Sequence, residues 1–240
     1  TTAINNIEQF EKNLNTQPGF LAQKIKNDYL SDKQGTLNNF YCFGNCSLML
    51  MGQNLSVCGQ LTEEEAEELL SFCQFMGVYG VEYGYKTLPV KDMDTMYLMK
   101  YSGDGGESSA DIVKNENIYQ FSQFSCSNFS GVAFNIVYSY FARKVNRQIS
   151  DIYYLEHKGK IVSGALATNF DNAVYLTFVS TAKNFRHQGL AKKVIDHIIS
   201  VNSHRDIILM CENELIPFYK KLGFDPYKET YLYTLRKEHI

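Results

Sequence analysis

The stretch AVYLTFVSTAKNFRHQGLAKKVIDHIIS, residues 173–200, predicts a strand, a turn and an amphipathic helix in that order. Residues 173–180 form an apolar, β-branched and aromatic run that is typical of a strand in a sheet. The helix is predicted to start near Gly189, and its apolar side chains recur at three- and four-residue steps, which places them on one face. This buried stripe is predicted to contain Leu190, Ala191, Val194, Ile195, Ile198 and Ile199. A second apolar strand follows at residues 207–211, and it must run parallel to the first because a helix crosses between them.

The turn between the first strand and the helix reads Arg186-His187-Gln188-Gly189-Leu190-Ala191. Small residues at 189 and 191 let a ligand approach the backbone, and the amides of a first helical turn have no partner inside the helix. Free amides, the helix dipole and a nearby arginine together suit a pyrophosphate. Taken alone, the pattern is equally that of a helix start whose small residues pack on a sheet.

A second motif, Phe218-Tyr219-Lys220-Lys221-Leu222-Gly223-Phe224, predicts a short helix over residues 215–222 that ends at a glycine. The Tyr219 hydroxyl of such a helix can point into a gap between neighbouring strands. The alternative is a core aromatic helix with a glycine stop. A last strand is predicted at residues 231–235.

Together and in this order, the two motifs resemble the GCN5-related N-acetyltransferase (GNAT) superfamily over residues 151–235. The resemblance implies an α+β, GNAT-like fold: a mixed, mostly antiparallel sheet flanked by helices, with a central parallel strand pair that splays apart. It also implies an acyltransferase that uses acetyl-coenzyme A (acetyl-CoA) as co-substrate, with Tyr219 as general acid. The coenzyme would be bound by Phe178, Val179, Ser180, Arg186, His187, Gln188, Gly189, Leu190, Ala191, Lys192, Asn213 and Phe218. One departure is that many relatives carry an Asn seven residues before the tyrosine, whereas here Asn213 stands six before it and Glu212 takes the seventh place.

The general base is less clear than the donor site. In the implied reaction a neutral amine attacks the thioester directly, and a backbone N–H near residues 178–180 stabilises the oxyanion. Relatives often carry a glutamate on the splayed strand, but residues 173–180 contain no carboxylate and no histidine. Glu156 or Glu212, at the ends of neighbouring strands, are the candidates for the base. His157 beside Glu156 is a further option, and a water relay is the alternative.

The N-terminal half repeats part of the same plan. A linker or exposed loop is predicted at residues 102–110, because this segment is rich in Gly and Ser. It separates an N-terminal α/β domain, residues 1–101, from the acetyltransferase domain, residues 111–240. Residues 39–83 predict paired strands, a helix that starts at the Thr62–Glu65 capping box, and a further strand.

This order suggests a degenerate half-copy of the acetyltransferase fold, although no R-x-x-G-x-G/A string occurs in it. The alternative is an unrelated α+β cap. The duplication hypothesis requires that residues 40–83 form a sheet flanked by the helix that follows Thr62. Within the C-terminal domain, an amphipathic helix is predicted from Phe129 to Phe141, with Val132 on its apolar face, followed by a hairpin of residues 151–156 and 161–167.

Composition narrows the function classes. Hydrophobic residues make up 45% of the chain, charged residues 20%, and the net charge is −3, which argues against a nucleic-acid or anionic membrane surface as the partner. The cysteines form no C-x-x-C pair, so we expect no metal site and buried free thiols. Their reduced state and the lack of a signal pattern favour the cytoplasm.

We therefore expect a cytoplasmic N-acetyltransferase, monomeric or homodimeric, that acts on a small-molecule amine. The alternatives are a non-catalytic acyl-CoA sensor or scaffold, and an enzyme that uses a longer acyl chain.

Overall fold

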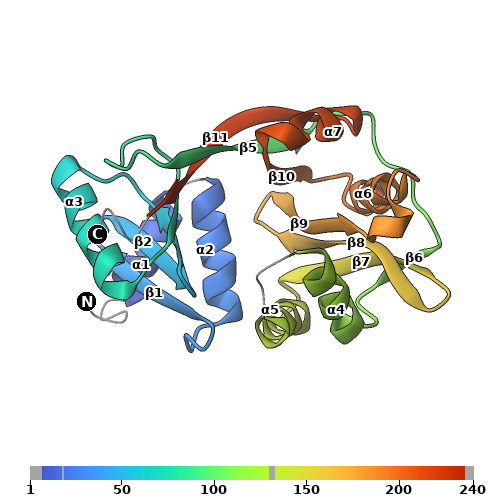
Figure 1. Ribbon diagram of the computed structural model, residues 1–240, viewed down its shortest axis with the longest axis horizontal. Helices are drawn as coiled ribbons and strands as arrows, with labels where there is room; N and C mark the ends of the chain where they lie inside the picture. Colours follow the sequence, from blue (N-terminus) through green and yellow to red (C-terminus); the bar gives the residue numbers. More distant parts are fainter. Residues whose placement is uncertain (1–6, 18, 130–132, 236–240) are drawn as a thin grey trace. The chain divides into compact units, whose positions relative to one another are not determined.

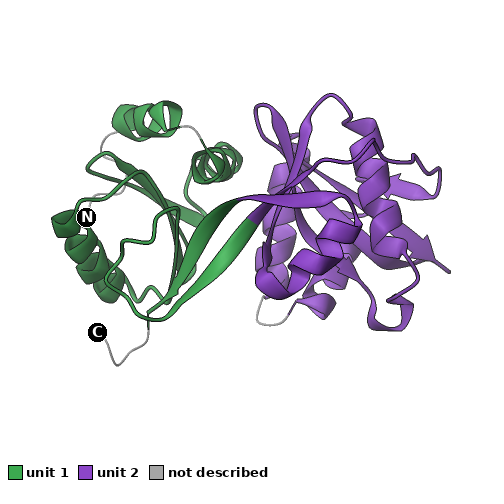
Figure 2. Ribbon diagram, turned by 90° about the horizontal axis from the view of Figure 1, so that it is seen from above, with its two compact units in different colours: residues 1–97, 228–240 green, residues 98–227 purple. Residues whose placement is uncertain are grey.

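The computed structural model describes residues 7–17, 19–129 and 133–235. Its chain divides into two compact units, one of residues 1–97 and 228–240 (unit 1) and the other of residues 98–227 (unit 2) (Figure 2). The chain passes between the units along two strands, β5 (Met93–Tyr101) and β11 (Phe224–Thr234). The compact units divide the chain after residues 97 and 227. The domain boundaries expected near residues 101 and 111 stay a prediction.

Unit 1 contains two helices, a small sheet and a crossover helix (Figure 1). These elements are α1 (Ile7–Thr16), α2 (Phe20–Ser31), β1 (Asn38–Phe43), β2 (Cys46–Met51), β3 (Asn54–Cys58), α3 (Glu63–Met76) and β4 (Gly80–Tyr83). Strands β1, β2 and β3 are antiparallel neighbours, and β4 runs parallel to β3 because α3 lies between them in sequence. The last residues of β11 pair antiparallel with β4. The sheet flanked by the Thr62 helix, which the duplication hypothesis requires, is therefore present.

Helix α3 begins and ends where its local sequence predicts. The Glu65 amide donates to the Thr62 hydroxyl at 3.2 Å, and the Thr62 amide donates to the Glu65 carboxylate at 2.8 Å. Gly77 ends the helix with a left-handed φ of 65°, a conformation that glycine adopts without steric strain.

Unit 2 has the same order of two helices, three strands, a helix and a strand, preceded by a further strand and followed by a further helix. Its elements are β6 (Ile112–Lys114), α4 (Ile118–Asn128), α5 (Phe134–Asn146), β7 (Ser150–His157), β8 (Lys160–Asn169), β9 (Ala173–Thr181), α6 (Leu190–Val201), β10 (Asp206–Glu212) and α7 (Ile216–Lys221). The strands lie in the order β6-β7-β8-β9-β10, and the end of β5 lies next to β10. All of the registered pairs from β6 to β9 are antiparallel, whereas β9 and β10 are parallel. The predicted mixed, mostly antiparallel sheet with a parallel pair is confirmed.

The sheet of unit 2 is covered on both faces. Along β7, Tyr153 and Leu155 pack in one apolar cluster with α6, while Ile152 and Tyr154 pack in another with α4 and α5. This division follows from the alternation of side chains along a strand. The predicted buried stripe of α6 is confirmed at Val194, Ile195, Ile198 and Ile199.

Four elements differ from the sequence-based expectations. Strand β6 and helix α4 were not predicted, and the helix expected from Phe129 begins at Phe134 instead. Val132, expected on its apolar face, lies outside the described residues. Strand β11 starts at Phe224 rather than at residue 231. The sequence did not predict its first half because residues 225–229 are exposed and lack an apolar pattern. Across the described residues, none of the helices combines the length and the apolar character needed to cross a membrane.

Candidate active site

The parallel strands β9 and β10 part halfway along their length. Residues Ala173 to Leu176 pair with Asp206 to Leu209, and the described residues show no further pairing between the two strands, although β9 continues to Thr181 and β10 to Glu212. The backbone of β9 beyond Leu176 therefore has no ladder partner on its β10 side. This is the splayed pair that the sequence predicted.

A β-bulge in β9 accompanies the parting. The register with β8 jumps from Leu166–Thr177 to Gly164–Ser180, so that Phe178 and Val179 together oppose one residue. Phe178 has a φ of 52°, a left-handed conformation that is strained for a non-glycine residue. Its ring packs edge-on against Phe141 at 4.9 Å and Phe129 at 5.4 Å. These contacts stabilise the bulge, which bends the strand away from its neighbour.

The turn after β9 exposes backbone amides at the start of α6. His187 and Gly189 both have a left-handed φ, of 62° and 76°, and no side chain caps the helix. A Cβ at Gly189 would meet no atom within 4 Å, so the space in front of it is open. The Arg186 Nε donates to the Thr181 carbonyl at 3.1 Å, which holds the side chain along β9. Such a turn can bind an anionic oxygen through several N–H groups at once.

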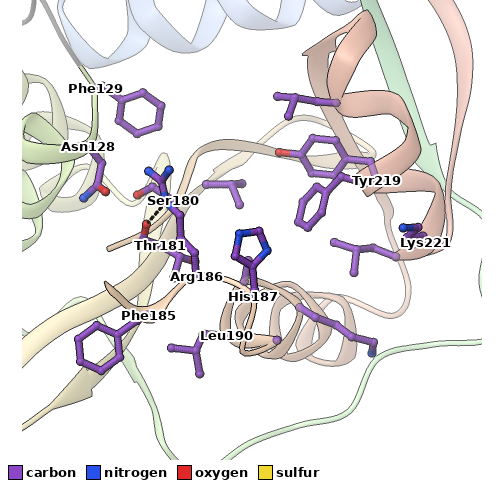
Figure 3. Close-up of a pocket in the computed structure, with 17 residues that line it drawn as sticks. Asn128, Phe129, Ser180, Thr181, Phe185, Arg186, His187, Leu190, Tyr219 and Lys221 are labelled. Carbon is purple, nitrogen blue, oxygen red and sulfur yellow. Dashed lines mark hydrogen bonds between the residues drawn. The ribbon is translucent and has the colours of Figure 1, made fainter. Parts of the chain in front are cut away.

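Tyr219 lies on the opposite side of this opening. The residue is 7% exposed, and burial, followed by the neighbouring Cys211, raises the pKa of its phenol to about 12. Its ring packs against Phe218 at 5.0 Å and Phe224 at 6.0 Å. Figure 3 shows the hydroxyl pointing into the cavity, and no described residue hydrogen-bonds to it. The phenol is therefore a protonated donor that is available to a ligand.

One cavity of about 690 Å³ in unit 2 contains both features, a size typical of small-molecule sites. The predicted site residues that line it are Val179, Ser180, Arg186, His187, Gly189, Leu190, Ala191, Lys192, Phe218 and Tyr219. The lining residues that sequence reasoning missed are Asn128, Phe129, Thr181, Phe185, Leu215, Lys221 and Leu222. Most of these adjoin the two motifs and could have been found by extending them. Asn128 and Phe129 come from α4 and its end, for which the sequence carried no signal.

Three predicted coenzyme contacts are not among the lining residues. The Phe178 ring packs with the α4–α5 apolar cluster instead. Gln188 donates to the Asn184 carbonyl at 3.4 Å. Asn213 is exposed in the short 3₁₀ turn Asn213–Leu215. Their predicted roles in binding remain predictions.

The two candidate bases are exposed at strand ends. Glu156 lies near the end of β7 and Glu212 at the end of β10, and neither lines the cavity. None of the described residues that line it is an aspartate or glutamate. No cluster of three or more His, Cys, Asp or Glu side chains suited to a metal ion occurs in the described ranges.

Cys211 adjoins the site but does not suit nucleophilic chemistry. It is 3% exposed, and its thiol donates to the Met99 sulfur at 3.3 Å. Burial, followed by the charge of Glu212, raises its pKa to about 11, so the reactive thiolate is disfavoured at neutral pH. Cys211 is thus one of the buried free thiols that the sequence leads us to expect.

Ser180, which lines the cavity, has a polar atom without a partner among the described residues. The Ser180 hydroxyl is buried and has no hydrogen bond within the described part of the chain. Buried polar atoms of this kind are rare in folded proteins. Together with the open space at Gly189, it fits a long ligand that carries both an anionic group and hydrogen-bonding groups along β9.

Comparisons with known proteins agree with this geometry. Residues 148–226 match the family model of the acetyltransferase (GNAT) domain. None of the curated proteins matches the chain significantly in sequence.

Solved structures match along almost the whole chain. An acetyltransferase of the GNAT family from Colwellia psychrerythraea is 14% identical with a TM-score of 0.54, and the match covers 92% of this chain and 98% of that one. A GCN5-related N-acetyltransferase from Kribbella flavida is 13% identical with a TM-score of 0.59, over 88% of this chain and 95% of the other. A tandem GNAT protein from the clavulanic acid biosynthesis pathway is 12% identical with a TM-score of 0.60, over 98% and 96%. At these identities the likeness concerns the fold, and it extends to the two-part arrangement of the tandem protein. Residues 148–226 are therefore a GNAT acetyltransferase domain, within a chain that has the GNAT fold.

Proposed function

We propose that the unit 2 cavity binds acetyl-CoA and that the protein transfers the acetyl group to the primary amine of a small molecule. The observation that carries this proposal is the parting of β9 and β10 within a cavity that also contains the Tyr219 hydroxyl. The unpaired edge of β9 offers backbone groups to a pantetheine arm, and the tyrosine offers a donor to its sulfur.

The start of α6 would bind the pyrophosphate. Its first-turn amides, from Leu190 onward, have no side-chain cap, and Arg186 adds a positive charge beside them. The Ser180 hydroxyl, which has no partner among the described residues, supports a hydrogen bond to the pantetheine arm. The fit therefore rests on this chain's own unsatisfied groups.

The chemistry is a direct displacement. The lone pair of the neutral amine attacks the thioester carbonyl carbon, a C–N bond forms, the C–S bond breaks, and its electron pair leaves with the sulfur. A backbone N–H of β9 near the Phe178 bulge would stabilise the negative charge on the oxygen. Tyr219 would donate a hydrogen bond to the departing sulfur.

Water is proposed as the acceptor of the proton that the attacking nitrogen loses. No carboxylate occurs among the described lining residues, and Glu156 and Glu212 are exposed at the ends of their strands. The acid limb of the pH–rate profile should then follow the pKa of the amine substrate. If the acid limb instead shows the same pKa with every amine, that pKa belongs to the enzyme and identifies a side-chain base.

The test is the release of free coenzyme A thiol from acetyl-CoA across a panel of amines, together with the calorimetric affinity for acetyl-CoA. We expect turnover with at least one amine. Tight coenzyme binding without turnover on any amine would support the sensor or scaffold alternative. Turnover only with longer acyl-CoA thioesters would support the longer acyl chain. The absence of both acetyl-CoA binding and turnover would refute the proposed function.

A further inference from the structure

Asn128 presents to the cavity a hydrogen-bond acceptor that no described residue uses. It ends helix α4, and its side-chain Nδ2 donates to the Phe124 carbonyl at 2.8 Å and to the Ser127 hydroxyl at 3.3 Å. A carbonyl can only accept, so these bonds assign the nitrogen to that side and leave Oδ1 as the free atom. No described residue donates to this oxygen. Figure 3 shows Asn128 and Phe129 on the side of the cavity opposite Tyr219.

The chemistry of the reactants decides what such an oxygen can bind. A thioester carbonyl and its sulfur have no hydrogen to donate, so the Asn128 oxygen can accept only from an N–H group, either of the pantetheine arm or of the attacking amine. The attacking amine does have N–H groups. We propose that Asn128 is a positioning residue for the acceptor, whose Oδ1 accepts a hydrogen bond from the amine that attacks the thioester. This inference rests on the proposed function.

The geometry of the bond also directs the lone pair. A primary amine that donates one N–H to Asn128 keeps its lone pair for the carbonyl carbon, and the proton lost after attack goes to water. The amide oxygen takes no proton in this step. Its contribution is orientation, which brings the reacting atoms into near-attack distance.

The surroundings of Asn128 indicate the class of acceptor. Phe129 lines the cavity next to it and packs edge-on against Phe178 at 5.4 Å, so the wall beside the amide oxygen is aromatic. The charged side chains among the described lining residues include Arg186, Lys192 and Lys221 and no carboxylate. A second positive charge on the acceptor would therefore lack a counter-ion. We infer a primary amine on an uncharged apolar or aromatic body, rather than a polyamine or a basic peptide.

The first experiment compares Asn128→Ala with Ser127→Ala as the matched control. Ser127 lies at the same helix end, where its hydroxyl donates to the same Phe124 carbonyl at 2.7 Å, but it does not line the cavity. For N128A we expect kcat/KM for the best amine to fall roughly 10- to 100-fold, with the acetyl-CoA Kd and amine-independent hydrolysis of acetyl-CoA within about twofold of wild type. S127A removes the longer of the two hydrogen bonds that Asn128 donates, but it should retain wild-type kcat/KM because the 2.8 Å bond to the Phe124 carbonyl remains.

A second variant separates function from folding. Asn128→Gln keeps an amide that can donate to the Phe124 carbonyl but displaces the oxygen by one methylene. If N128A lowers the thermal midpoint, N128Q should show the kinetic loss without it. Unchanged amine kinetics in both variants would overturn the inference. So would a weakened acetyl-CoA Kd with an unchanged amine KM, because the oxygen would then be receiving a pantetheine N–H.

The substrate class is tested with wild type and Asn128→Asp. Wild type should favour a phenylalkylamine over an aliphatic diamine of similar length by at least about tenfold in kcat/KM, and N128D should narrow that ratio because it adds the missing carboxylate. Equal or better turnover of the diamine by wild type would overturn the assignment. Failure of wild type to bind acetyl-CoA or to acetylate any amine would refute the proposed function and this inference together, a result distinct from every variant-specific outcome.

Discussion

Replacing Tyr219 by phenylalanine removes one oxygen atom from the cavity and leaves the ring in place. The ring is held by Phe218 and Phe224, and the hydroxyl has no hydrogen bond to any described residue. The variant therefore loses no hydrogen bond to a described residue, and its thermal midpoint should equal or exceed that of wild type. Any kinetic effect then belongs to the reaction.

The size of that effect follows from the phenol's pKa of about 12. A free thiol has a pKa of about 8.5, so complete transfer of the proton from the phenol to the thiolate would cost about 5 kcal/mol, at 1.36 kcal/mol per pKa unit. Tyr219 should therefore act as a hydrogen-bond donor to the leaving sulfur rather than as a full acid. A hydrogen bond to a charged group contributes about 1.5–3 kcal/mol, which predicts a fall in kcat of about 10- to 160-fold for Tyr219→Phe.

The assay is thiol release at saturating amine and acetyl-CoA, across the pH range. We expect kcat to fall while the acetyl-CoA Kd stays unchanged, since the bond forms only as the sulfur leaves. Wild type should show no alkaline limb from tyrosine ionisation below about pH 11, because its phenol stays protonated there. A kcat within twofold of wild type in Y219F would refute the role of Tyr219. A wild-type alkaline limb that disappears in Y219F would refute the reasoning from burial.

Three further predictions concern the turn at α6, the loop that packs on it, and the cap of α3. Gly189→Ala and Gly159→Ala both place a Cβ in open space at a left-handed φ, of 76° and 72°, so each variant should lose about 1 kcal/mol of stability. Only the change at Gly189, which lines the cavity, should weaken acetyl-CoA binding in calorimetry, and Gly189→Val should weaken it more. Equal affinities of the Gly189 and Gly159 variants would remove this turn from the site. His197 on α6 accepts a hydrogen bond from the Ser109 amide at its Nδ1, at 3.1 Å, and burial lowers the pKa of the imidazole. As the pH falls, the unfolded chain therefore takes up the proton before the folded one does. The contribution of His197 to stability is complete above about pH 6.5 and is lost as the pH falls through the lower pKa of the folded state. His197→Asn, which keeps an acceptor that does not titrate, should flatten this part of the pH–stability curve measured by chemical denaturation, and an unchanged curve would contradict the assignment. Thr62→Ala removes the capping hydroxyl of α3 and should cost about 1 kcal/mol in urea unfolding, with acetyl-CoA affinity unaltered; a change in affinity would argue that unit 1 takes part in coenzyme binding.

Elements with strong local signals were predicted from the sequence, and those held by tertiary contacts were not. Helix α3 has a capping box at one end and a glycine at the other, and both ends matched. The β9–α6–β10 crossover was specified by its apolar periods, which also fixed the parallel pairing. Helix α4 has a serine-rich, aromatic sequence without a clear amphipathic period, and it is stabilised by packing Phe121 and Phe124 on the sheet. No window of sequence contains that information.

The site divides in the same way. The turn at residues 186–191 and Tyr219 are local motifs, and the structure places both at one cavity. Asn128 reaches that cavity only because α4 packs under β9, and the bulge at Phe178 forms where aromatic rings from α5 and the end of α4 stabilise a left-handed residue. A phenylalanine is a poor sequence marker for such a conformation, because glycine or asparagine is the usual signal. The proposed donor side of the site was therefore predictable, and the proposed acceptor side required the fold.

The two units differ in whether the amides at the start of the crossover helix are capped. In unit 2 the helix that follows β9 begins at a glycine, with amides open to the cavity. In unit 1 the corresponding helix, α3, has its amides engaged by the Thr62–Glu65 capping box, and three glutamates occupy its first turn.

The loop before α3 is closed as well, since the Leu61 amide donates to the Tyr83 hydroxyl at 2.9 Å. Strands β3 and β4 stay in register as far as Val57 and Tyr83. The groups that would receive a pyrophosphate in unit 2 are thus satisfied internally in unit 1, where carboxylates would repel it. A degenerate copy of the fold should differ from a working one in this way, by closing its ligand-binding groups onto themselves while it keeps the order of its strands and helices.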